Sequence, residues 1–120
     1  MIAGDLNGHV GKASGGYEGI HGGRGFGTRN TEGERILEFS DATGMVVANT
    51  MFCKRSSRLI TYQSGNNSSQ IDYILVSKNI MRFVNVKVIS GKEVDSQHRL
   101  VTCDLNLEAF IKEVKKPFLP

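Results

Sequence analysis

The stretch Gln70-Ile71-Asp72-Tyr73-Ile74-Leu75-Val76 decides the fold of this chain. Its aliphatic, β-branched and aromatic side chains predict a buried β-strand. Asp72 stands inside this apolar run, where a charged group is costly unless it is paired or hydrogen-bonded. The sequence therefore predicts a strand whose carboxylate has a partner elsewhere in the chain.

Further strands are predicted on both sides of this run, and one main helix before it. The strand candidates are residues 45–49, 59–63, 83–89 and 100–107, with a turn at 64–69 and a short helical or turn segment at 77–82. A helix is predicted from about Thr31 to Thr43, because Thr31 and Glu34 fit a capping box and Gly44 can close the last turn. Strands predominate and most links are short, so we expect an α+β fold with a mostly antiparallel sheet.

A glycine-rich stretch between Gly11 and Gly27 predicts a mobile surface loop. It does not fit a nucleotide-binding loop. Gly11-Lys12 has Leu6 and Ala13 where the motif GxxxxGK[ST] needs a glycine and a hydroxyl, and GxGxxG is absent as well.

The bulk composition indicates one globular domain. The chain has 120 residues, 39% of them hydrophobic and 22% charged, which is enough to bury a core without disulfides or metals. Cys53 and Cys103 are far apart in sequence and outside any CxxC motif, which favours an intracellular, reducing setting. No apolar run is long enough to cross a bilayer. We expect a domain over residues 1–110 followed by a basic, amphipathic tail at 111–120.

A mild positive charge is compatible with a polyanionic partner such as DNA. Fifteen Lys and Arg against twelve Asp and Glu give a net charge of +3 and an isoelectric point near 9.0. Any solvated surface carries such residues too, so the charge alone does not distinguish a DNA-binding protein from other proteins. The candidate contacts with phosphates or with a protein partner are Arg24, Arg29, Lys54, Arg55, Arg58, Lys115 and Lys116.

The first group of residues that could take part in catalysis is Gly4-Asp5-Leu6-Asn7-Gly8-His9. Asp5 and Asn7 are two residues apart, so they project from one face at a predicted strand end. A carboxylate can orient or deprotonate a water, and a carboxamide can donate to a phosphate oxygen as negative charge builds. The alternative is a simple turn, which Asp and Asn-Gly also favour.

A second constellation, Asp95-Ser96-Gln97-His98-Arg99-Leu100, is a polar loop that runs into a strand. It places His98 at the end of the sheet, where it is the natural partner for Asp72. A carboxylate that holds one ring nitrogen fixes the tautomer and raises the basicity of the other nitrogen. The alternative is an ordinary surface histidine.

These motifs, in this order, resemble the endonuclease/exonuclease/phosphatase superfamily, in which GDxN, [IV]DYI and Ser-Asp-His form the back half of one active site. The segments GDLNGHVG, EGERILEFS, ITYQSGN and IDYILVSK are similar to LINE-type retrotransposon endonucleases over nearly the whole chain. The resemblance implies the C-terminal half of a four-layered, DNase I-like α/β sandwich. It also implies hydrolysis of DNA phosphodiesters with Mg²⁺, or Mn²⁺ in its place.

The resemblance also implies roles for individual residues. Asp5 would activate water and serve as a weak metal ligand, Asn7 would stabilise the transition state, Asp72 would orient His98, and His98 would contact the scissile phosphate. Thr61, Tyr62 and Arg58 would lie near the DNA.

Two departures from the family pattern imply weak activity, or none, for this chain alone. The family's early Asn, its principal Glu ligand and its Tyr lie upstream of GDxN, and Gln97 stands where the family has the Asp of Ser-Asp-His. We therefore expect poor metal binding and a sheet that needs covering by an N-terminal half, a second copy or a protein partner. The alternative is a domesticated, non-catalytic module that binds nucleic acid or protein. For either function we expect a nuclear location and no membrane partner.

Overall fold

The computed structural model describes residues 1–89 and 97–115. It mixes helices with antiparallel sheets, so the predicted α+β class is confirmed. The order of elements is β1 (Ile2–Asp5), α1 (Thr31–Thr43), β2 (Met45–Val47), η1 (Ala48–Met51), η2 (Ser56–Arg58), β3 (Tyr62–Ser64), β4 (Asn67–Ser69), β5 (Asp72–Ser77), η3 (Lys78–Phe83), β6 (Val84–Ile89), β7 (Leu100–Leu105) and α2 (Leu107–Val114), where η marks a 3-10 helix.

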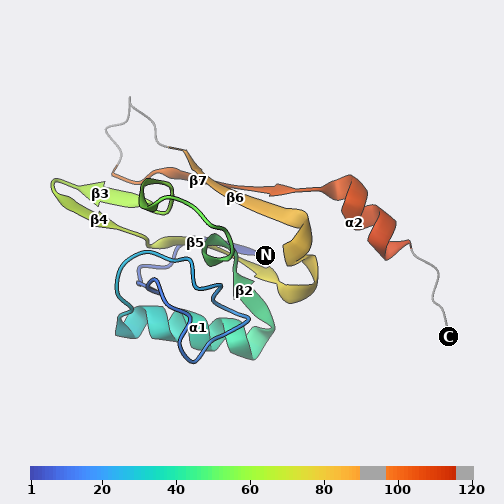
Figure 1. Ribbon diagram of the computed structural model, residues 1–120, viewed down its shortest axis with the longest axis horizontal. Coiled ribbons are helices and arrows are strands. Elements are labelled where there is room, and N and C mark those ends of the chain that lie inside the picture. The colour runs from blue at the N-terminus through green and yellow to red at the C-terminus, as the bar shows by residue number, and fades with distance from the viewer. Residues whose placement is uncertain (90–96, 116–120) are drawn as a thin grey trace.

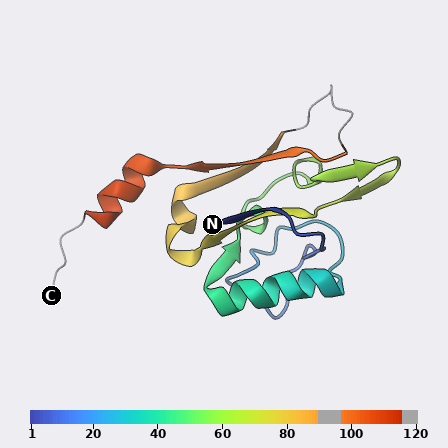
Figure 2. The same ribbon diagram turned by 180° about the vertical axis from the view of Figure 1, so that it is seen from behind.

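The predicted strand around Asp72 is the centre of the molecule. β5 lies between β1 and β2 in an antiparallel sheet and is buried on both faces. Tyr73 and Leu75 pack toward α1, whereas Ile74 and Val76 pack toward β6. Figures 1 and 2 show the resulting layers, with α1 on one side of the central sheet and the β6–β7 hairpin on the other. A strand covered on both faces reads as a continuous apolar run.

The two ends of the molecule are formed by smaller units. β3 and β4 make a two-stranded hairpin that extends from the start of β5 (Figure 1). At the other end α2 packs on η3, where the rings of Phe83 and Phe110 meet edge to face with centroids 5.6 Å apart. Helix α2 runs across the boundary that we expected between a domain ending at residue 110 and a tail beginning at residue 111. No helix within the described ranges is long and apolar enough to span a membrane.

Several predicted boundaries of strands and turns were wrong. The hydrogen bonds of the backbone and of capping side chains determine where these elements begin and end. β2 ends at Val47, where the chain turns into η1. The predicted strand 59–63 becomes β3 only at Tyr62. The predicted turn 64–69 is reduced to Gly65-Asn66, because backbone pairing, which is independent of polarity, carries Asn67–Ser69 into β4. β7 ends at Leu105, since Asn106 caps α2 by accepting from the Ala109 N–H.

Helix α1 has the predicted extent but a different N-cap. The side chain of Asn30, rather than Thr31, caps it, because Asn30 Oδ1 accepts from the Gly33 N–H at 2.8 Å. The same oxygen accepts from the His9 N–H at 2.9 Å and so ties the helix to the segment after β1. The predicted closure by Gly44 is confirmed, with a left-handed φ of 69°.

The glycine-rich loop is packed against the core, which contradicts the prediction of a mobile surface loop. Ile20 and His21 are buried within it. Arg29 donates to the carbonyl groups of Val10, Ala13 and Gly15. The Arg29 guanidinium is thus used to hold the loop and is not a free phosphate contact.

We expect Gly33→Ala to destabilise the protein by more than about 3 kcal/mol, beyond ordinary overpacking. A Cβ at this position would lie 1.7 Å from the His9 carbonyl oxygen, and one at Gly8 would lie 2.9 Å from the Gly33 nitrogen. The backbone of α1 is in direct contact with the backbone of His9, so no side-chain movement can make room for the added methyl group. An unobstructed Gly→Ala change inside a helix normally stabilises by about 1 kcal/mol. Urea unfolding of the variant measures the effect.

The matched control is Gly15→Ala, since a Cβ at Gly15 meets nothing within 4 Å. It should change the unfolding free energy by less than about 0.5 kcal/mol. Equal stability of Gly33→Ala and Gly15→Ala would contradict the close approach of α1 to His9.

We expect His21 to make stability depend on pH in the acid range. Its Nδ1 accepts from the Gly23 N–H at 2.9 Å, so Nε2 carries the proton and donates to the Gly11 carbonyl at 2.7 Å. Burial, assisted by the nearby Arg29 charge, lowers the pKa of His21 below its ordinary 6.5. Between these two pKa values His21 is protonated in the unfolded chain and neutral in the folded chain. The free energy of unfolding therefore falls as the pH drops from about 6.5 toward the folded-state pKa.

Urea unfolding at about pH 7.5 and pH 5.5 measures this dependence, with His21→Gln as the comparison. At the higher pH the free energy of unfolding of the variant should be lower than that of wild type by about 1–3 kcal/mol for each backbone group left unpaired. Between the two pH values, this free energy should change less in the variant than in wild type. An identical pH dependence in both proteins would show that His21 is not responsible.

Candidate functional site

The register between β1 and β5 brings two carboxylates together. Asp5 lies directly opposite Asp72, at the last position of β1 and the first of β5. Side chains of directly opposed residues stand on the same face of an antiparallel sheet. The two acidic groups that the sequence placed far apart therefore occupy one end of the central sheet.

The structure brings His98 to these carboxylates. His98 forms an isolated antiparallel bridge with Tyr62, just before β7. Its Nδ1 lies 2.9 Å from Asp72 Oδ2, and its Nε2 lies 3.8 Å from Asp5 Oδ2. The side chains of His98 and Asp5 are 42% and 45% exposed, and that of Asp72 is 15% exposed. A ligand in solution can thus reach the side of His98 that faces Asp5.

The hydrogen bond to Asp72 determines what His98 can do. A carboxylate oxygen only accepts, so Nδ1–H is the donor and the lone pair of the neutral ring is on Nε2. The 3.8 Å between Nε2 and Asp5 is too long for a hydrogen bond. The two groups therefore face a shared space in which each can accept a proton or hold a polar ligand.

Two polar residues fix the backbone that carries Asp72. Thr61 is fully buried, and its Oγ1 accepts from the N–H groups of Ile71 and Asp72 at 3.0 and 3.1 Å. A side chain with no exposure cannot touch DNA, so Thr61 positions Asp72 instead of binding a substrate. Asn49, which the sequence did not single out, donates to the Asp72 carbonyl and accepts from the Ile74 N–H. It continues the pairing of β5 beyond the end of β2.

Tyr62 shares the site, whereas Gln97 is turned toward the hairpin. The Tyr62 ring meets the His98 ring edge to face, with centroids 4.9 Å apart. The Tyr62 hydroxyl donates to Gln97 Oε1 at 2.9 Å, and Gln97 Nε2 donates to Ser64 Oγ at 3.1 Å. The neutral amide of Gln97 is thus engaged with β3. The other acid of this segment, Asp95, lies outside the described residues.

Asn7 lies beside the carboxylates, but Arg58 makes no contact with them. The backbone N–H of Asn7 donates to Asp5 Oδ1 at 2.9 Å, and its left-handed φ of 49° belongs to a tight turn. The turn leaves the side chain of Asn7 exposed next to Asp5, so a turn and a functional role are compatible here. Arg58 lies on η2, and none of its described contacts joins it to His98.

The Tyr73 hydroxyl anchors the loop after β1 to the central strand. It accepts from the Val10 N–H at 3.1 Å and lies 2.7 and 2.6 Å from the carbonyl oxygens of Gly8 and Gln70. Burial raises the pKa of Tyr73, so the phenol keeps its proton and donates it to one of these carbonyls. The sequence predicted Tyr73 only as an apolar strand residue and gave no sign that its hydroxyl anchors this loop.

The acidic groups and His98 have the spacing of a cation site. Each of Asp5, Asp72 and His98 offers a ligand atom, and these atoms all lie within 4.8 Å of one another. Mg²⁺ commonly takes one or two carboxylates and keeps several waters, and Mn²⁺ also accepts imidazole nitrogen. The donor set therefore fits a weakly held divalent cation.

The fold and the site together define an α+β protein with an Asp–His pair and a second carboxylate at one end of an antiparallel sheet. The chain is 35% identical to craniofacial development protein 2 of Tragulus javanicus and of Bos taurus, over 98% of its own length. It is thus homologous to a segment of that protein, and it spans about a fifth of those relatives, 21% and 20%. No protein-family profile matches the chain. No solved structure matches it either.

We expect Asp72→Asn to change the tautomer of His98. The carboxylate accepts the Nδ1 proton, and an amide in its place can present either an acceptor or a donor, so the neutral ring loses its fixed orientation. Nitrogen-15 shifts of the ring at alkaline pH report which nitrogen carries the proton. Wild type should be protonated at Nδ1, and the variant should show a mixture of tautomers.

The control for this measurement is Asp104→Asn, which removes an exposed carboxylate that pairs with Lys87 in the β6–β7 hairpin. It should leave the His98 shifts unchanged. Protonation of wild-type His98 at Nε2 would contradict the geometry of the Asp72 contact.

Proposed function

We propose that Asp5, Asp72 and His98 form the core of a phosphodiesterase site that acts on DNA, derived from a retrotransposon endonuclease of the endonuclease/exonuclease/phosphatase type. The observation that carries the proposal is the hydrogen bond from His98 Nδ1 to Asp72, which turns Nε2 toward Asp5 across an accessible gap of 3.8 Å. The backbone of Asp72 is in turn fixed by hydrogen bonds to Thr61 and Asn49, so the carboxylate that orients His98 has a defined position, unlike the surroundings of an ordinary surface histidine.

The arrangement divides the work of in-line hydrolysis among three groups. Asp5 would orient the attacking water and accept its proton. When His98 is protonated, its Nε2 would donate to a phosphate oxygen while Asp72 stabilises the imidazolium. The exposed carboxamide of Asn7 would donate to an oxygen that gains charge in the transition state. Tyr62, packed on His98, would limit the positions that the ring can take.

The proposal includes Mg²⁺, or Mn²⁺, held by the carboxylates of Asp5 and Asp72. When bound, a divalent cation supplies a Lewis acid that polarises the phosphate and neutralises charge on it. Within residues 1–89 and 97–115, the carboxylates of this group are those of Asp5 and Asp72, and the amide of Gln97 faces Ser64. Weak metal binding and slow hydrolysis by this chain are therefore part of the proposal.

A non-catalytic binding module is the second candidate, and the engagement of Gln97 favours it. A neutral amide bonded to Tyr62 and Ser64 contributes no charge to a metal or to His98. A nuclear location stays a prediction.

We also propose a partner that covers exposed apolar surface: an N-terminal half, a second copy or another protein. Phe39, which is 47% exposed, is one of the large apolar side chains that such a partner would cover.

We expect the protein to nick supercoiled plasmid slowly with Mg²⁺ or Mn²⁺ and to lose this activity with EDTA. His98→Ala and Asp5→Asn should each lower the rate roughly 10²-fold or more, since each removes a group that meets the reacting phosphate or water. Agarose gel electrophoresis of the nicked and supercoiled forms measures the rate. Circular dichroism checks that each variant is folded.

Asp41→Asn is the matched control for Asp5→Asn, because Asp41 is an exposed carboxylate at the end of α1, close in sequence to Met45, which pairs with Ser77 at the far end of β5 from Asp72. It should keep the wild-type rate. Nicking that survives His98→Ala would place the activity elsewhere. No nicking by wild type with either metal would reject hydrolysis and favour the binding module.

A further inference from the structure

A second candidate site is formed by residues 53–59, which include η2, together with the glycine-rich loop and the end of β6. Two adjoining hollows meet at Lys54, with volumes of about 370 and 480 Å³, within the usual range of ligand clefts, roughly 300–1,000 Å³. We call their combined surface the basic groove. Its side chains that bear on binding are Lys12, Arg24, Phe26, Lys54, Arg58 and Lys87.

The basic groove gathers cations that have few internal counterions. Within residues 1–89 and 97–115, no carboxylate lies within 4.0 Å of the charged groups of Lys12, Arg24, Lys54 or Arg58. Lys87, at the rim, pairs with exposed Asp104 at 3.8 Å. Like charges gathered in a concave surface raise the local potential and attract a polyanion.

Local contacts orient the cations and add aromatic surface. The Arg24 guanidinium donates to Cys53 Sγ at 3.2 Å, which keeps it over the groove. The Lys54 ammonium lies 5.6 Å from the centre of the Phe52 ring. Phe26 is half-buried in the groove wall and leaves part of its ring accessible. Cations beside an aromatic surface are typical of proteins that bind single-stranded nucleic acid, in which phosphates meet the charges and bases stack on the rings.

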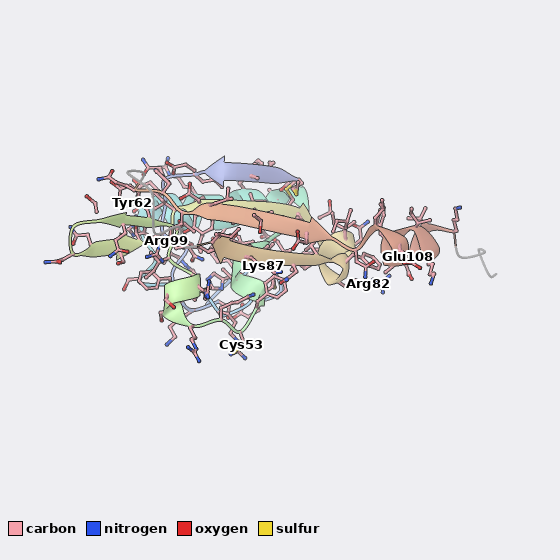
Figure 3. The ribbon with its side chains drawn as sticks, turned by 90° about the horizontal axis from the view of Figure 1, so that it is seen from above. Cys53, Tyr62, Arg82, Lys87, Arg99 and Glu108 are labelled. Atoms are coloured by element: carbon pink, nitrogen blue, oxygen red, sulfur yellow. The ribbon has the colours of Figure 1, made fainter. Side chains whose placement is uncertain are left out.

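The basic groove is separate from the Asp72–His98 site. None of its lining residues is Asp5, Asp72, His98 or Tyr62. Figure 3 shows Cys53, which lines the groove, on the side of the molecule away from β1, whose last residue is Asp5, whereas Tyr62 lies near the hairpin end. Arg58, expected beside the substrate, belongs to this groove.

We propose that the basic groove binds the sugar–phosphate backbone of single-stranded nucleic acid, with Lys54 at its centre and a base stacked on Phe26. An acidic protein segment would use the same cations but would leave the aromatic ring without a planar partner, which favours nucleic acid. The proposal does not depend on hydrolysis at His98, because binding requires neither the carboxylates nor a metal.

Fluorescence anisotropy with a labelled oligothymidylate of about 12 nucleotides, in EDTA, tests the groove without any cleavage. Lys54→Glu should weaken binding about tenfold or more and lower the slope of log affinity against log salt by about one. Phe26→Leu should weaken binding about tenfold at every salt concentration and leave this slope unchanged. The control Lys78→Glu makes the same charge change at an exposed position on η3 and should alter affinity less than threefold.

Protection of Cys53 locates the ligand on the protein. Cys53 is exposed and free, so its alkylation by a maleimide should slow in the presence of the oligonucleotide, as measured by peptide mass spectrometry. Equal losses of affinity in Lys54→Glu and Lys78→Glu, or no protection of Cys53 by bound oligonucleotide, would overturn the proposal. Polyglutamate that protects Cys53 as well as the oligonucleotide does would overturn it in favour of an acidic protein partner.

Discussion

The antiparallel pairing of β1 with β5 is the constraint on which the rest of the structure depends. A slip of one residue would turn every side chain of β1 to the opposite face. It would separate Asp5 from Asp72, and it would also move the apolar residues of β1 out of contact with the core. The Tyr73 hydroxyl of β5 supports this register by binding Gly8 and Val10 in the loop after β1. The Thr61 hydroxyl fixes the start of β5 by accepting from the N–H groups of Ile71 and Asp72. The hydrophobic core and the polar site therefore specify the same register.

The polar groups around Asp72 show how a charge is kept at the end of a buried strand. The carboxylate is 15% exposed and accepts a hydrogen bond from His98, while Asn49 and Thr61 satisfy the neighbouring backbone groups. Unpaired backbone groups at this depth would each cost about 1–3 kcal/mol. The strand thus keeps its hydrogen bonds beyond the ends of its neighbours, and the charge needs no metal to be tolerated.

Much of the framework could be predicted from local sequence. The helix from Thr31 to Thr43 and its closing Gly44 follow from spacing and from a glycine that accepts a left-handed φ. The partnership of Asp72 with His98 followed from the cost of a buried charge. Features set by distant contacts could not be predicted. Asn30 and Thr31 are both good capping residues, and only the His9 N–H, far away in sequence, selects Asn30. In the same way, polar Thr61 gave no sign that it would be buried beneath Asp72.

The contact between Gly8 and Gly33 has a consequence for tracing the history of such chains. It needs two glycines at a distance in sequence, together with Asn30, which joins helix α1 to His9. These residues serve the scaffold and not the chemistry, so they can persist after the carboxylates and the histidine have been replaced. A search for a glycine shortly after the first strand, followed downstream by Asn-x-x-Gly at the start of a helix, would detect descendants that keep the architecture after Asp5, Asp72 and His98 have been replaced.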